Sequence, residues 1–398
     1  MPKNIVILFD GTSNQVSEDR TNILRLYGTL EKSRRQLVFY DPGVGTLAAR
    51  DSRFTPLPDI AEFWARLTGD GLHANVKEAY RFLVENYERG QPGRGERDAI
   101  HIFGFSRGAY TARVLAGFIN AFGLIEPRNL NLLDYAFRAY RRIGHEKSDP
   151  RPDSQSISQL PNPSFAEMRL YEHALRPDRP PIRLLGLFET VSSVIEWGPV
   201  LPELRNRAFT QTNPSVESIR HAVAIDERRT MFAPQLWPAG QPYYGNPFKK
   251  RIARIQDVRE VWFAGSHGDV GGGHPDRESG LAKIALAWMV DQSIACGVHF
   301  NTRTVNTIVK GLGKVPRYAK PDPLAAAHNS MRNGWPLLEF LPRKRVDGSK
   351  RPALFGYTLP LFERRPIPDG ARIHHSVFRR EARYGRPQNL PHDYVIED

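Results

Sequence analysis

The segment Gly104-Phe105-Ser106-Arg107-Gly108 carries the clearest chemical signal in this sequence. An apolar run over 99–103 precedes it, and a helix-like run over 109–122 follows it. A serine at the apex of a sharp strand-to-helix turn projects its hydroxyl off the sheet, and glycines two residues away on each side leave room for neighbouring backbone. We therefore predict that Ser106 is a nucleophile. The alternative interpretation is a serine that only caps the helix.

A serine nucleophile needs a base that removes its proton and an acid that orients the base. Glu189 and His267 follow Ser106 in the chain, and each lies just past an apolar run. The chain order serine, acid, histidine is the order found in α/β-hydrolases. We predict that His267 is the base and Glu189 the acid.

Other residues remain as alternatives for these roles. His274 is the reserve candidate for the base, and Asp226 and Asp269 are alternatives for the acid. Asp269 could instead order the loop that carries His267. A metal site is a further alternative, with candidate ligands His267, Asp269, Asp10, Asp41 and His274, but their spacing matches no H-E-x-x-H motif. We expect no metal and no other cofactor.

The oxyanion that forms when a carbonyl is attacked needs backbone N–H donors. We expect the amide of Arg107, at the start of the helix, to be one donor. The loop Asp10-Gly11-Thr12, which follows the first apolar run, is expected to supply the other from Gly11 or Thr12. Asp10 is expected to brace this loop by accepting hydrogen bonds from backbone amides.

Short apolar runs alternate with helical stretches along the first 300 residues, which indicates an α/β fold with a mostly parallel sheet covered by helices on both faces. The predicted strands are Ile5–Phe9, Leu37–Tyr40, Ile100–Phe105, Ile182–Phe188 and Val258–Ala264. The predicted helices are Thr21–Ser33, Leu72–Arg89, Tyr110–Phe122, Ser215–Ala224 and Leu281–Cys296. Polar or glycine-rich motifs follow every predicted strand, and the carboxyl ends of parallel strands meet in one cleft.

We expect one α/β-hydrolase domain over residues 1–398. The polar, proline-rich stretch 144–181 is expected to be a lid or cap insertion, and 301–398 a basic C-terminal extension of the same domain. An amphipathic stretch over 54–72 is expected to be a packed helix.

The net charge of +13 is concentrated at the C-terminal end, where residues 301–398 hold 18 Lys and Arg against 9 Asp and Glu. Such a surface could contact anionic lipid headgroups. No nucleic-acid-binding motif accompanies it, so nucleic acid is not the expected partner. The sequence has no 18-residue apolar run and no recognisable signal peptide, and the one cysteine, Cys296, excludes an internal disulfide. We expect synthesis in the cytoplasm, which is compatible with leaderless export.

Six motifs between residues 5 and 275 together resemble the DUF2235 family, whose characterised members are Tle1-type phospholipase effectors of type VI secretion. The motifs are Ile7-Leu8-Phe9-Asp10-Gly11-Thr12, Tyr40-Asp41-Pro42-Gly43-Val44-Gly45-Thr46, Gly104-Phe105-Ser106-Arg107-Gly108-Ala109-Tyr110, Phe188-Glu189-Thr190-Val191-Ser192-Ser193-Val194, His221-Ala222-Val223-Ala224-Ile225-Asp226-Glu227-Arg228-Arg229 and Phe263-Ala264-Gly265-Ser266-His267-Gly268-Asp269-Val270-Gly271-Gly272-Gly273.

The resemblance implies an α/β-hydrolase with a Ser–Asp–His triad that acts on phospholipid esters. Ser106 and His267 match the family pattern directly, whereas Glu189 stands where the family usually has aspartate. The resemblance also implies a lipid substrate and a secretion or immunity protein as partner.

The leading hypothesis is a serine ester hydrolase of the lipase or phospholipase type that works through an acyl-enzyme. Two alternatives belong to other classes: a non-catalytic binding or regulatory protein with the same fold, and a metal-dependent phosphoesterase.

Overall fold

The computed structural model describes most of the chain. The described residues are 2–11, 20–43, 70–90, 96–146, 170–171, 173–191, 195–197, 202–204, 208–245, 254–313, 317–332, 335–345, 349–354 and 356–398. The predicted helix over 54–72 falls almost wholly outside them, as does most of the predicted lid over 144–181.

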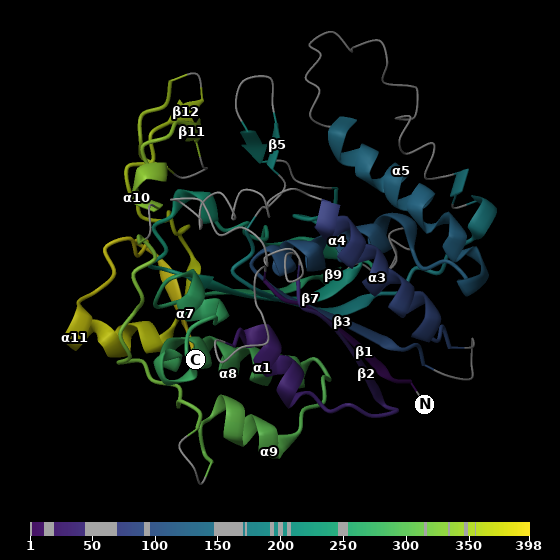
Figure 1. Ribbon diagram of the computed structural model, residues 1–398, viewed down its shortest axis with the longest axis horizontal. Helices are drawn as coiled ribbons and strands as arrows, with labels where there is room; N and C mark the ends of the chain where they lie inside the picture. The colour runs from purple at the N-terminus through teal and green to yellow at the C-terminus, as the bar shows by residue number, and fades with distance from the viewer. Residues whose placement is uncertain are drawn as a thin grey trace, which may run out of the picture.

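One eight-stranded sheet organises the molecule, and its strands are all parallel (Figure 1). The spatial order is β14-β13-β10-β7-β4-β3-β1-β2. The bounds are β1 Asn4–Phe9, β2 Gln36–Asp41, β3 Ala99–Phe105, β4 Ile182–Phe188, β7 Val216–Ala224, β10 Asp257–Phe263, β13 Ala371–His374 and β14 Tyr394–Glu397. The predicted α/β class is therefore confirmed.

Among the residues that the structure describes, three two-stranded sheets lie outside the central sheet. They pair β5 (Ile195–Trp197) with β6 (Pro202–Leu204), β8 (Pro242–Tyr243) with β9 (Arg254–Ile255), and β11 (Arg343–Lys344) with β12 (Tyr357–Thr358).

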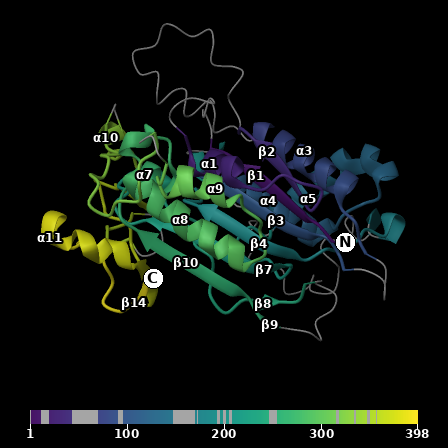
Figure 2. The ribbon, with the colours of Figure 1, turned by 90° about the horizontal axis from the view of Figure 1, so that it is seen from below.

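Helices cover both faces of the sheet, as Figures 1 and 2 show. On one face lie α3 (Asp70–Asn86), α4 (Arg107–Phe122) and α5 (Leu133–Glu146). On the other lie α1 (Asn22–Thr29) and α8 (Gly280–Ala295). Shorter α-helices are α7 (His267–Gly271), α9 (Thr302–Thr304), α10 (Trp335–Leu338) and α11 (Glu381–Tyr384). Short 3₁₀-helices are η1 (Pro127–Leu132), η3 (Thr230–Phe232), η5 (Asp276–Glu278) and η7 (His375–Arg380), and η6 (Val305–Val309) is a π-helix.

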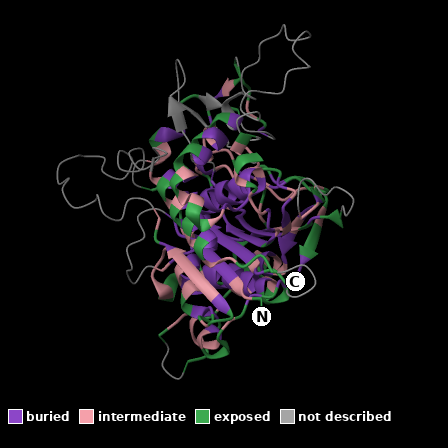
Figure 3. Cartoon of the chain, turned by 90° about the vertical axis from the view of Figure 1, so that its right-hand side faces the viewer, coloured by how far each residue is buried: buried purple, intermediate pink, exposed green. Residues whose placement is uncertain are grey.

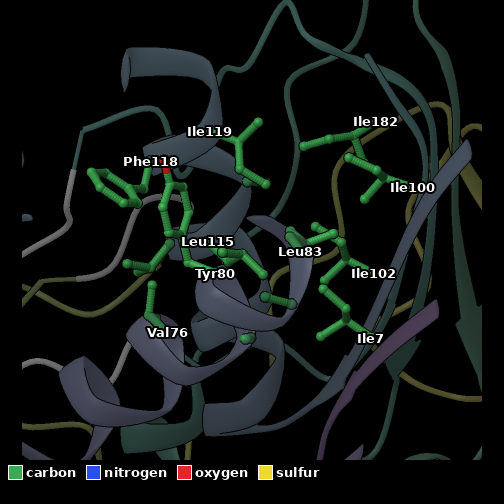
Figure 4. Close-up of a cluster of buried hydrophobic side chains, with 14 of the residues drawn as sticks. Ile7, Val76, Tyr80, Leu83, Ile100, Ile102, Leu115, Phe118, Ile119 and Ile182 are labelled. Atoms are coloured by element: carbon green, nitrogen blue, oxygen red, sulfur yellow. The ribbon is translucent and has the colours of Figure 1, made fainter. Parts of the chain in front are cut away.

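In the described part of the chain, the two layers of helices create two hydrophobic cores, one on each face of the sheet, and a third, smaller cluster forms around β13. Successive strand residues point to opposite faces. Ile5 and Ile7 accordingly join the core under α3 and α4, whereas Val6 and Leu8 join the core under α1 and α8. Figure 4 shows the first core, where Tyr80 and Phe118 lie among aliphatic side chains. Figure 3 shows the central strands as a buried layer, whereas the edge strands β2 and β14 are partly exposed.

The predicted strands and four of the five helices predicted in alternation with them are confirmed, but the prediction of a helix over Ser215–Ala224 is wrong. This segment forms β7, which lies between β4 and β10 and is almost wholly buried. Its polar residues have partners inside the fold: Arg220 pairs with Asp257, and the His221 ring lies 2.7 Å from Glu260. Polar side chains whose spacing suggests the exposed face of a helix can therefore belong to a buried central strand when each of them has a partner.

The last 98 residues contribute β13 and β14, which extend the central sheet beyond β10 and which the sequence pattern did not indicate. Helix α7 and the carboxyl ends of β3, β4, β7 and β10 consequently lie in the middle of the sheet edge, where the predicted nucleophile, acid and base belong.

Candidate active site

Ser106 occupies the turn between β3 and α4 with backbone angles of φ 58° and ψ −119°. A positive φ in a residue other than glycine is strained and recurs at functional sites. A Cβ on Gly104 would lie 2.4 Å from the Gly108 carbonyl oxygen, and a Cβ on Gly108 would lie 2.3 Å from the carbonyl oxygen of Phe9. Only glycine fits at either position, which gives the predicted spacing a physical reason.

The Ser106 side chain makes no capping hydrogen bond to α4. Its Oγ instead lies 2.9 Å from Nε2 of His267. The interpretation of Ser106 as a mere helix cap is therefore wrong.

His267 begins α7 directly after the β10 end, and its second ring nitrogen, Nδ1, lies 2.8 Å from the Glu189 carboxylate. The rings of Phe105 and Phe232 pack against the imidazole with centroid distances of 4.9 and 4.8 Å. Burial lowers the pKa of His267 below its ordinary value, and the neighbouring Glu189 carboxylate offsets part of this effect. A neutral imidazole in this position can accept a proton from Ser106.

Glu189 follows β4, is fully buried and has a φ of 48°. Burial alone would raise the pKa of its carboxyl, but Arg365 and His267 outweigh burial and hold this pKa at about 2. Glu189 is therefore an anion at neutral pH and can stabilise a positive charge on His267. The structure thus brings the predicted nucleophile, base and acid into one chain of contacts.

Arg365 is a part of this site that sequence reasoning missed. Its Nη1 and Nη2 donate to the two carboxylate oxygens of Glu189 at 2.8 and 2.9 Å. Arg365 lies in the basic region over 301–398, where no local pattern distinguishes it from arginines on the surface.

Glu227 is a second missed residue. Its Oε2 accepts a hydrogen bond from the His267 backbone N–H at 3.1 Å, and Arg229 donates to both of its oxygens at 2.9 Å. Burial would raise the pKa of Glu227, but Arg229 holds it well below the usual range. Glu227 thereby fixes the start of α7.

The two alternatives for the acid have other partners. Asp226 accepts the backbone N–H of Gly265 at 2.7 Å. Asp269 forms a capping box with Ser266 at the start of α7 and also accepts from the backbone and ring of His328 at 2.9 and 2.6 Å. Both carboxylates order the backbone around His267.

The reserve base His274 lies beside Asp269 and His328. One ring nitrogen of each histidine and one carboxylate oxygen of Asp269 lie within 4.8 Å of one another, close enough for a metal site to be considered. The rings of His274 and His328 are stacked 3.6 Å apart in nearly parallel planes, so their in-plane lone pairs do not converge. The Asp269 carboxylate already accepts four hydrogen bonds from Ser266 and His328. We interpret this cluster as a clamp that holds residue 328 against α7.

The loop after β1 supplies Asp10 and Gly11, whereas Thr12 lies outside the described residues. The Asp10 carboxylate accepts hydrogen bonds from the Gly11 amide at 2.6 Å, from Thr21 at 2.7 Å and from the Tyr40 hydroxyl at 2.8 Å. Asp10 therefore braces this loop as expected, and the Gly11 amide has an acceptor in the Asp10 carboxylate.

Comparison with protein families identifies a match over residues 3–292 to the catalytic domain of the Tle1-like phospholipase effectors of type VI secretion. The chain belongs to this family. The match covers the nucleophile turn, Glu189 and His267, but ends before Arg365.

The chain is also 33% identical over 250 residues to an uncharacterized protein of Saccharomyces cerevisiae, an alignment that covers 61% of this chain and 33% of the yeast protein. Among solved structures it is similar to an uncharacterized protein from Pseudomonas aeruginosa (17% identity, TM-score 0.41, 81% of this chain and 50% of that one). It is also similar to the Tle1 effector bound to the VgrG spike of the type 6 secretion system (17% identity, TM-score 0.32, 70% and 53%). The chain therefore spans about a third of the yeast relative and about half of these two structures.

Within the described part of the chain, no helix has the length and hydrophobicity needed to cross a bilayer.

Proposed function

We propose that this protein is a serine hydrolase that cleaves carboxylic esters, with phospholipids as the substrate class. One observation carries the proposal: Ser106 Oγ, the two ring nitrogens of His267 and the Glu189 carboxylate form a continuous series of contacts of 2.9 and 2.8 Å. The phospholipid part of the proposal rests on the family to which the chain belongs.

The reaction would proceed in two halves. His267 Nε2 accepts the Ser106 proton while Oγ forms a bond to the ester carbonyl carbon, and Glu189 stabilises the imidazolium. The tetrahedral intermediate collapses when His267 protonates the departing alcohol, which leaves an acyl group on Ser106. Water, deprotonated by His267, then attacks the acyl-enzyme and releases the carboxylic acid and the free serine.

The oxyanion of both tetrahedral intermediates would accept hydrogen bonds from backbone amides. We assign the Arg107 amide, at the start of α4, and the Thr12 or Gly11 amide to this role. Loss of one such donor typically costs about 3–4 kcal/mol of transition-state stabilisation.

The Tle1 effector is seen bound to a VgrG spike, and we propose that this chain likewise has a secretion-spike protein as a partner.

The basic region over 301–398 is proposed to contact anionic headgroups when the enzyme meets its substrate.

Fatty acid release from vesicles of phosphatidylglycerol and phosphatidylethanolamine tests the proposed substrate class. We expect release by the wild-type protein that is unaffected by EDTA, with no hydrolysis of p-nitrophenyl phosphate. Hydrolysis of a soluble short-chain ester without fatty acid release would restrict the proposal to esters other than phospholipids. Phosphate monoester hydrolysis that EDTA abolishes would contradict it.

The pH dependence of ester hydrolysis is expected to reflect the buried position of His267. Only the neutral imidazole can accept the serine proton, and burial lowers the pKa of His267 below the ordinary histidine value of 6.5. Activity should therefore be retained below pH 6.5, and the acidic limb of kcat/KM should have its midpoint below that value. A midpoint above it would show that the imidazolium is stabilised more strongly than burial destabilises it.

A further inference from the structure

Arg365 is buried against the Glu189 carboxylate and shares the Oε2 atom of that carboxylate with His267. Its residue surface is 6% exposed, and its two terminal nitrogens form a fork on the two oxygens of Glu189. Planar guanidinium groups hold carboxylates in this way with both position and angle fixed. Glu189 consequently has one orientation in which Oε2 also faces Nδ1 of His267.

The same guanidinium group binds the backbone on two sides of the site. Nη1 donates to the carbonyl oxygen of Ala224, at the end of β7, at 2.9 Å, and Nη2 donates to the carbonyl oxygen of Phe232 in η3. The Ala224 amide in turn donates to Glu189 at 2.6 Å, and the Phe232 ring packs on His267. Arg365 therefore joins the triad acid to the segments that enclose the base.

Other charged groups around this pair are themselves matched. Glu227 accepts from the His267 backbone and is paired with Arg229. On β7, the His221 ring lies 2.7 Å from Glu260 and accepts the Thr190 amide. On α7, Asp269 is held by Ser266 and His328. Among the described residues, Arg365 and the His267 ring are the basic groups paired with the Glu189 carboxylate, and Arg365 is the one that is charged while His267 is neutral.

We propose that Arg365 is the positioning residue of the triad acid, which fixes the Glu189 carboxylate toward His267 and neutralises its buried charge before catalysis. The inference deepens the proposed function and rests on it. It also gives a reason why glutamate can serve at position 189: the longer side chain has more rotamers, and a fork from Arg365 selects one of them.

The sign of the expected pH effect follows from the charge. Without Arg365, the buried Glu189 anion has lost its counter-ion, so the Glu189–His267 pair binds a proton more tightly, whichever of the two groups holds it. The pair must lose that proton before His267 can act as a base. The acidic limb of the reaction therefore moves to higher pH when Arg365 is replaced.

Fluorophosphonate labelling of Ser106 tests this without a known substrate, because the labelling rate depends on deprotonation of the serine by His267. The rate is measured as a function of pH for the wild-type protein, Arg365→Gln and Arg365→Lys. We expect the acidic limb of Arg365→Gln to move up by about one pH unit or more. Arg365→Lys keeps the positive charge but loses the paired hydrogen bonds to the Glu189 carboxylate. Its acidic limb should therefore lie between those of the wild type and Arg365→Gln, and its maximal labelling rate should fall.

Arg179→Gln is the matched control, because Arg179 is a buried arginine that donates to the backbone carbonyls of Asn120 and Ala121, at the end of α4 opposite to Ser106. It should lower the melting temperature without moving the limb. An unshifted limb in folded Arg365→Gln would overturn the inference and leave Arg365 a structural residue only. If Arg365→Gln does not fold, the test uses Arg365→Lys. An unshifted acidic limb and an unchanged maximal labelling rate in Arg365→Lys would then overturn the inference. Absence of labelling in the wild-type protein would instead contradict the proposed function itself.

Discussion

Ser106→Ala is expected to reduce kcat for ester hydrolysis by about 10⁴- to 10⁶-fold, because the acyl-enzyme cannot form without Oγ. The fold should be unaffected, since the Ser106 side chain caps no helix and alanine tolerates the positive φ no worse than serine does. Hydrolysis of a p-nitrophenyl ester and a thermal melt measure the two effects.

Ser33→Ala is the control for this experiment, because Ser33 lies in the turn before β2 and its Oγ contacts only the backbone amide of Arg35 among the bonds described. It should retain wild-type activity. An activity of Ser106→Ala within tenfold of the wild type would remove Ser106 from the mechanism.

Glu189→Gln is expected to combine a catalytic loss with a loss of stability. An amide cannot stabilise the imidazolium, and comparable changes to a triad acid lower kcat by about 10⁴-fold. The variant also leaves the Arg365 guanidinium buried without its carboxylate, which typically costs about 3–5 kcal/mol in the free energy of unfolding. Ester hydrolysis and urea denaturation measure the two losses.

Glu189→Asp and Glu397→Gln separate these contributions. Aspartate keeps the charge but is one methylene shorter, so we expect partial activity. Glu397 pairs with Arg259 and Arg372 at the sheet edge, on the second strand beyond β10, and contacts none of the triad residues in the bonds described, so its replacement should affect stability alone. Near wild-type activity in Glu189→Gln would assign the role of the acid to another residue.

The sequence predicted best those features whose backbone geometry depends on residues close together in the chain, such as the turn around Ser106. The glycines around Ser106 are required by contacts within two residues of the nucleophile or with β1, so a local motif predicts the turn. Glu189 and His267 were predictable because parallel strands place their carboxyl ends together.

The missed features depend on contacts that are distant in the sequence. Arg365 lies 176 residues from Glu189, and no local pattern indicates which of the many C-terminal basic residues enters the site. The polar residues of β7 have helix-like spacing, and only their partners on β10 and α8 allow them to be buried in a strand. Strands β13 and β14 have four residues each, too few for a clear pattern.

The most direct test of the account is to locate the adduct that a fluorophosphonate forms with the protein. Mass spectrometry of the digested wild type should show one adduct, on the peptide that contains Ser106. Ser106→Ala should show no adduct, and His267→Ala should be labelled far more slowly. An adduct on a different residue, or no adduct in a folded wild-type protein, would contradict the claim that Ser106, His267 and Glu189 form a working triad.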